Sequence, residues 1–118
     1  MLLYKIINAR KAIEELAQKE IDGDLAYRMA KFLYDTASDQ EFYASAVRKA
    51  YTNFGEQNEA AEITVPKEKE QDFRNAIEKV GNTVADDPKH KFPLSKLKEA
   101  GFTVSQIYAL LDFIDEEG

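Results

Sequence analysis

The stretch LAYRMAKFLYDTASDQEFYASAVRKAYTNFG (residues 25–55) is the longest helical pattern in the chain and decides its fold class. Its apolar residues fall at helical spacing: Leu25, Met29, Phe32, Leu33, Phe42, Val47, Ala50, Tyr51 and Phe54. Residues 38–41 (SDQE) match a capping box, so two helices could meet at residues 37–38. One continuous helix is equally compatible, because neither glycine nor proline interrupts the stretch before Gly55.

A second amphipathic helix precedes this stretch. Apolar side chains from Leu2 to Ala17 recur at helical spacing, with charged residues on the other face. The helix is expected to end near IDGD (residues 21–24), where Gly23 breaks it and Asp24 supplies an N-cap oxygen. Small residues on both helices would let the backbones approach closely, so we expect an antiparallel helix hairpin at the N-terminus.

In the middle of the chain, the spacing of the apolar residues changes from a helical to a strand-like pattern. EITV (residues 62–65) alternates like a short strand and is stopped by Pro66, which also suits the first turn of a helix. A helix with one apolar face should follow and end at Gly81. Residues 83–94 then form either a small hairpin around DDPKH (residues 86–90) or an ordered loop.

The C-terminal stretch KEAGFTVSQIYALLDFIDEEG (residues 98–118) carries the most consistent local cues. A short helix should end at Gly101, and Thr103 with Gln106 forms a capping box for a final helix that continues to Ile114. Together the elements predict a mainly α fold with a minor β element: an N-terminal antiparallel helix hairpin plus C-terminal helices and a short strand or hairpin. One domain should span residues 1–118.

The charge distribution is not the one expected of a nucleic-acid-binding protein. Sixteen basic and 22 acidic residues give a formal net charge of −6 and a pI of about 4.8. Residues 1–59 hold eight basic and ten acidic side chains, and residues 60–118 hold eight and twelve. Neither half is therefore a basic arm hidden inside an acidic total.

The chain contains no cysteine, which excludes disulfides and thiolate metal sites and fits a reducing compartment. Lys5 interrupts the N-terminal apolar run too early for a signal-peptide core. The longest wholly apolar run, residues 107–111, is far shorter than a membrane span. We therefore expect a cytoplasmic protein without a membrane partner.

LKEAGFTVSQIYALLDF (residues 97–113) resembles the helix pair of mercury-resistance-type regulators, in which a Leu-x-x-x-Gly-Phe-Ser-x-x-x-Ile pattern recurs. The resemblance implies a helix-turn-helix reader of DNA. In that family the pattern follows a basic winged head, and nothing similar precedes Leu97. The acidic residues 115–117 would repel phosphates. A capped helix corner that packs into a core is therefore favoured, with a DNA-binding regulator as an alternative.

A metal site and an enzyme active site are two further possibilities, and both would depend on the residues around His90. Asp86, Asp87 and His90 could hold a divalent ion, but ordinary turn chemistry explains them better, because Lys89 and Lys91 lie beside them. His90 is the only imidazole, and the chain has neither a Gly-x-Ser-x-Gly elbow nor a glycine-rich phosphate loop. We expect no catalytic residue, metal, cofactor or small-molecule substrate.

Four tyrosines are the candidate interaction surface. Tyr27 and Tyr34 are seven residues apart and could share one helix face, and so could Tyr43 and Tyr51. Exposed tyrosines favour protein interfaces. The alternative is that these side chains line the edge of the core with their hydroxyls in water.

The order of the motifs resembles small uncharacterised proteins that phages and prophages of Gram-positive bacteria encode. The likeness rests on hydrophobic positions: ITVP (residues 63–66), NTV (82–84), FPLSKL (92–97) and LLDFI (110–114). It implies an accessory protein in the host cell cytoplasm. We expect a non-enzymatic protein–protein interaction protein that presents a helical face to itself, as a homo-oligomer, or to a protein partner. The alternative is an acidic inhibitor of a host nuclease or defence complex.

Overall fold

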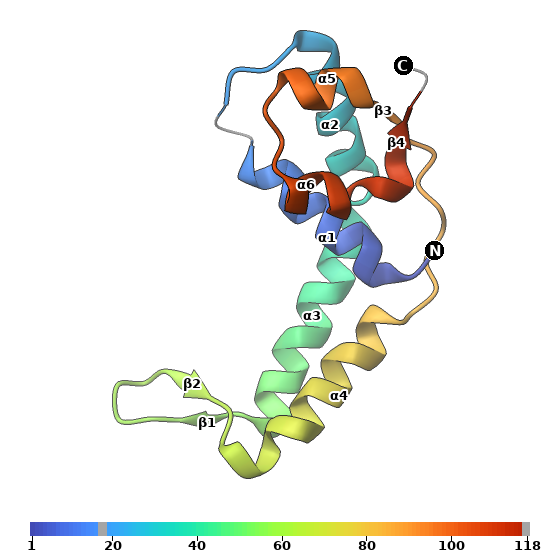
Figure 1. Ribbon diagram of the computed structural model, residues 1–118. Coiled ribbons are helices and arrows are strands. Elements are labelled where there is room, and N and C mark those ends of the chain that lie inside the picture. Colours follow the sequence, from blue (N-terminus) through green and yellow to red (C-terminus); the bar gives the residue numbers. More distant parts are fainter. Residues whose placement is uncertain (17–18, 117–118) are drawn as a thin grey trace.

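The structure, a computed structural model, describes residues 1–16 and 19–116. It consists of a head and a projecting arm (Figure 1), with principal-axis extents of 49 × 31 × 23 Å. The head contains α1 (Leu3–Glu15), α2 (Gly23–Asp35), α5 (Leu94–Glu99) and α6 (Val104–Ala109). The arm contains α3 (Ala37–Phe54) and α4 (Glu70–Gly81) and ends in a ribbon of β1 (Glu56–Gln57) and β2 (Ile63–Thr64). The predicted class, mainly α with a minor β element, is confirmed.

The head is built around an apolar core. Phe32 lies fully buried in it, with its ring centroid 5.0 Å from that of Phe113 and 5.8 Å from that of Phe92, both edge-on. Each such aromatic pair adds about 0.5–1.5 kcal/mol to the burial itself. The remaining buried residues of this core come from both ends of the chain: Ile6, Ala9, Ala12, Ile13, Leu16, Leu25, Met29, Leu97, Phe102 and Leu110.

The long helical stretch is broken at Thr36, so the two-helix alternative is the correct one. The Thr36 hydroxyl donates to the Phe32 carbonyl at 2.7 Å and accepts from the Arg10 guanidinium at 2.8 Å. Arg10 also donates to the Leu33 carbonyl at 2.7 Å. The bond from Arg10 satisfies the Leu33 carbonyl at the end of α2, where a helix leaves carbonyls without backbone partners, and the Phe32 carbonyl accepts from the Thr36 amide as well as from its hydroxyl. The expected capping residue, Ser38, lies instead inside the first turn of α3.

The long antiparallel helix pair is formed by α3 and α4, which run side by side away from the head (Figure 1). Tyr51 of α3 and Phe73 of α4 face each other, with ring centroids 4.8 Å apart. The two N-terminal helices, for which the sequence suggested a hairpin, cross each other within the head (Figure 1). The reason is that the apolar face of α1 also packs against the C-terminal segment. The expected end of the first helix, Ala17, lies outside the described residues.

Within residues 83–94 the chain forms an ordered loop up to Lys91, then a short strand and the first residue of α5, so the hairpin alternative is wrong. Val84 makes a single antiparallel bridge to Leu2. Farther along, β3 (Phe92–Pro93) pairs in parallel with β4 (Ile114–Asp115) near the C-terminus. The partners of this segment are therefore both distant in sequence.

The final helix is shorter than the sequence suggested. Its capping box is present, with the Thr103 hydroxyl accepting from the Gln106 amide and the Gln106 side chain accepting from the Thr103 amide. The helix ends at Ala109, and a 3-10 turn (Leu111–Phe113) follows it. The expected continuation to Ile114 is lost because that residue begins β4.

Candidate interaction surface

The arm has almost no buried interior of its own. Ala50 is the only buried residue of α3 and Gly81 the only buried residue of α4. The large apolar side chains between or beside the two helices are half-buried: Tyr43, Val47, Phe54, Phe73, Ile77 and Val80. A single pair of helices cannot enclose apolar stripes that are each 100° or more wide. Helix α1 packs against both helices of the arm, but the large apolar side chains of the arm nevertheless remain partly accessible.

Helix α3 carries two neighbouring stripes with alternating three- and four-residue spacing. The first, which we call the inner stripe, consists of Tyr43, Val47, Ala50 and Phe54 and lies on the side of the helix where Ala50 is buried. The second, which we call the Phe42 stripe, consists of Asp39, Phe42, Ala46, Lys49 and Asn53. Helices that contact two neighbours carry adjacent stripes of this kind.

Phe42 is the most conspicuous member of its stripe, because 55% of it is exposed to solvent. Ala46 follows one turn later and is half-buried. Asp39 and Lys49 flank this apolar pair, and neither makes an ion pair with any residue that the structure describes. The stripe thus has an exposed apolar centre with one negative and one positive end.

The four tyrosines of the predicted surface do not form one patch. Tyr27 and Tyr34 are 66% and 82% exposed on the outer side of α2. Tyr43 belongs to the inner stripe of α3 and is half-buried, and Tyr51 packs against Phe73. An interface role for the four stays a prediction. In the sequence, Phe42 is one member of the helical pattern, and its position outside the inner stripe was the available signal of a separate role.

The head carries an open groove of about 560 Å³ between α1 and α6. Tyr4, Tyr108 and Leu111 line it with exposed apolar surface, and Tyr108 is 76% exposed. The Lys5 ammonium lies 3.5 Å from the Asp112 carboxylate across the groove. Sequence reasoning missed this groove because its two walls come from opposite ends of the chain.

The residues of the suggested metal site have separate partners. His90 Nε2 lies 2.8 Å from the Asp35 carboxylate, and the His90 ring meets Phe32 edge-on at 5.6 Å. The Asp87 carboxylate lies 2.7 Å from the N-terminal amine of Met1, which lowers the pKa of that carboxyl. Across residues 1–16 and 19–116, no three acidic, histidine or cysteine side chains gather in a way that could hold a metal ion.

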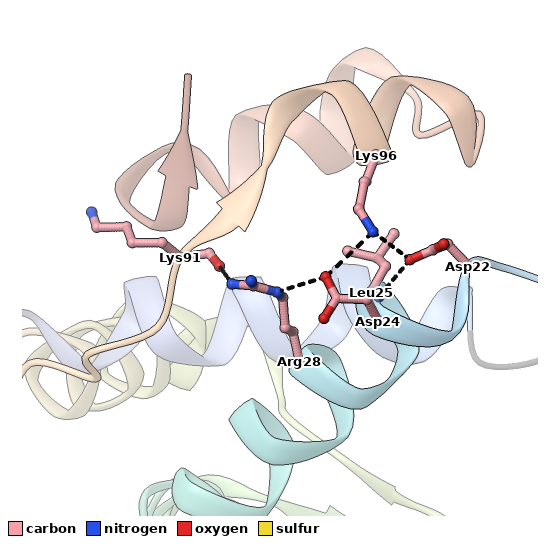
Figure 2. Close-up of polar contacts among 6 residues, drawn as sticks. All are labelled: Asp22, Asp24, Leu25, Arg28, Lys91 and Lys96. Carbon is pink, nitrogen blue, oxygen red and sulfur yellow. Dashed lines mark hydrogen bonds and ion pairs between the residues drawn. The ribbon is translucent and has the colours of Figure 1, made fainter. Parts of the chain in front are cut away.

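An ion-pair cluster fastens α5 to the start of α2 (Figure 2). The Lys96 ammonium lies 2.7 Å from Asp22 and 3.3 Å from Asp24. The pKa of Asp22 is lowered chiefly by the hydrogen bond from Lys96, and that of Asp24 chiefly by the one from Arg28. The pKa of Lys96 is raised, first by its bond to Asp22. Because Arg28 also donates to the Lys91 carbonyl, the cluster has a structural role.

The helix pair suggested as a DNA reader consists of α5 and α6, which are six residues long each. The second of them packs against α1 and carries neither lysine nor arginine. Its exposed side chains are Val104, Ser105 and Tyr108. Lysine and arginine neutralise the charge of DNA phosphates, and α6 offers neither, so that among its exposed side chains only the hydroxyls of Ser105 and Tyr108 could donate to phosphates there.

No family model matches the sequence, and neither a curated protein nor a solved structure matches it significantly. In the described parts of the chain, no helix combines the length and the apolar character that crossing a bilayer requires.

Proposed function

We propose that the protein is a non-enzymatic protein–protein interaction module that presents its α3–α4 arm to a protein partner in the cytoplasm. The observation that carries the proposal is the scarcity of buried residues in the arm: among residues 37–81, Ala50 and Gly81 alone are buried. An accessory protein of phage or prophage origin is part of the same proposal, on the ground that the hydrophobic positions of the sequence resemble those of such proteins.

The dimensions of the arm support this role. Helix α3 has 18 residues and is therefore about 27 Å long. Two helices, each about 10 Å across, present a face of roughly 500 Å² in projection. A standard protein interface buries about 800 Å² on each partner. One face of the arm therefore supplies a large part of a stable interface, and burying its half-exposed side chains contributes about 25 cal/mol per Å² of apolar surface.

Capture and footprinting together test the proposal. The immobilised protein is exposed to bacterial lysate, and hydrogen exchange is then compared for the free protein and for its complex with whatever binds, including further copies of the chain. We expect slower exchange in residues 37–81 and little change in α5 and α6 of the head. Protection confined to the head, or an arm that no protein protects at any concentration, contradicts the proposal.

The ribbon at the end of the arm favours a second candidate function, inhibition of a basic nucleic-acid channel. Glu59 and Glu62 are exposed there, and neither makes an ion pair within the described residues. An acidic projection of this kind complements a cationic channel. In a salt titration the affinity for such a partner should fall steeply, and replacing Glu59 and Glu62 by glutamine should remove most of the salt dependence.

A further inference from the structure

We propose that the partner of the Phe42 stripe is a second copy of this chain, packed antiparallel against the Phe42 face of α3 around a two-fold axis at the level of residue 44. The inference rests on the proposed function and narrows it, because it names the occupant of one face of the arm.

The geometry of the stripe leads to this arrangement. In a two-fold contact, residue i of one copy meets residue j of the other, and residue j meets residue i. When two α3 helices run antiparallel and the two-fold axis crosses them at the level of residue 44, Phe42 of each copy lies opposite Ala46 of the other. Phe42 is large and exposed, and Ala46 is small. A large side chain opposite a small one lets two helices approach closely, and a buried aromatic anchor dominates the stability of many interfaces.

The charges of Asp39 and Lys49 favour the same antiparallel register. In the antiparallel arrangement Asp39 of each copy lies opposite Lys49 of the other, so that two pairs of opposite charge flank the two Phe42–Ala46 pairs. Both charges lack an ion pair within the described chain. In a parallel arrangement Asp39 would face Asp39 and Lys49 would face Lys49, and these like charges would repel. The antiparallel arrangement is therefore favoured by both the apolar centre and the charged ends.

The inner stripe of α3 is also consistent with this arrangement. Tyr43, Val47 and Phe54 are half-buried on the helix that packs against α4 and α1, while the Phe42 stripe runs alongside them. An antiparallel pairing of two α3 helices brings the α3–α4 pairs of the two copies together in a four-helix assembly. In such bundles each helix contacts two neighbours through adjacent stripes, as α3 is patterned to do.

The test is the oligomeric state of the purified full chain, measured by light scattering and sedimentation over a wide concentration range. We expect a monomer–dimer equilibrium in the wild type. Phe42→Ser should raise the dissociation constant by at least about tenfold, as expected for a central anchor. Tyr108→Ser is the matched control, because Tyr108 is also an exposed aromatic residue but lies on α6 in the head. It should leave the dissociation constant unchanged.

Charge reversal tests the register itself. Asp39→Lys and Lys49→Asp should each raise the dissociation constant about tenfold, because each places like charges opposite one another. The double variant should restore it to within about threefold of the wild-type value. Circular dichroism of every variant checks that the fold is kept.

Three outcomes overturn the inference: a monomer at all concentrations, a dimer that Phe42→Ser does not weaken, or single charge reversals that the double variant fails to rescue. A monomer whose arm is protected by a different captured protein overturns the second copy as occupant and leaves the proposed function standing. Failure of both experiments removes both proposals.

Discussion

The Arg10 guanidinium donates a hydrogen bond of 2.8 Å to the Thr36 hydroxyl, and both side chains are buried at the junction of head and arm. Arg10 lies on α1, whereas Thr36 lies between α2 and α3. This one contact therefore ties the first helix to the place where the chain leaves the head for the arm. It stabilises the break between α2 and α3, where the arm begins.

Replacing Thr36 by valine should destabilise the protein by about 1–3 kcal/mol, because Arg10 then loses a buried acceptor. Thr52→Val is the matched control. The Thr52 hydroxyl also donates to the carbonyl four residues earlier, but Thr52 is exposed. Its replacement should change stability by less than about 0.5 kcal/mol. Urea denaturation followed by circular dichroism measures both, and equal effects would contradict the assigned role of Thr36.

Phe32 in the core of the head and Phe42 on the surface of the arm should respond differently to replacement by alanine. Phe32→Ala should cost about 3–5 kcal/mol of stability, because Phe32 is fully buried between Phe92 and Phe113. Phe42→Ala should cost less than about 0.5 kcal/mol in the monomer, since Phe42 is exposed. Thermal unfolding at a low protein concentration compares the two variants. A large loss for Phe42→Ala under those conditions would mean that Phe42 packs within its own chain.

The cluster of Asp22, Asp24 and Lys96 should make stability depend on pH. The pKa values of both carboxyls lie below their ordinary 3.8. Their contribution is therefore present above pH 3.8 and is lost as the pH falls through the lowered pKa values. Lys96→Met should lower the melting temperature at pH 6, and the gap to the wild type should narrow toward pH 2.

The control for this cluster is Lys98→Met, which removes an exposed lysine of the same helix. It should leave the melting temperature at pH 6 close to that of the wild type. If the gap between the wild type and Lys96→Met stays constant from pH 6 to pH 2, the carboxylates are not the source of the stabilisation.

Two capping boxes suggested by the sequence should behave differently when their first residue is changed to alanine. Thr103→Ala should cost about 1 kcal/mol, because the Thr103 side chain accepts a hydrogen bond from the Gln106 amide. Ser38→Ala should cost almost nothing, since Ser38 lies within the first turn of α3 and does not cap it. Chemical denaturation of the two variants measures the difference. A loss for Ser38→Ala equal to that for Thr103→Ala would place the start of α3 at Ser38.

The features that the sequence predicted correctly are short-range ones. The Thr103–Gln106 capping box, the strand at Ile63–Thr64 and the end of α4 at Gly81 all depend on residues within a few positions of one another. Hydrogen bonds and side-chain periodicity over such distances are set by the chain itself, whichever way the elements later pack. The mainly α class followed from them.

The arrangement of the elements was decided by contacts between distant residues. The break at Thr36 depends on Arg10, 26 positions earlier, and the end of α6 depends on the pairing of Ile114 with Phe92. The spacing of the residues shows that Phe42 lies outside the inner stripe, but only the packed structure shows that Phe42 is left exposed. Periodicity identifies the apolar faces of the helices, but it does not say which faces pack against each other. Only the packing of the whole chain shows which face is left exposed.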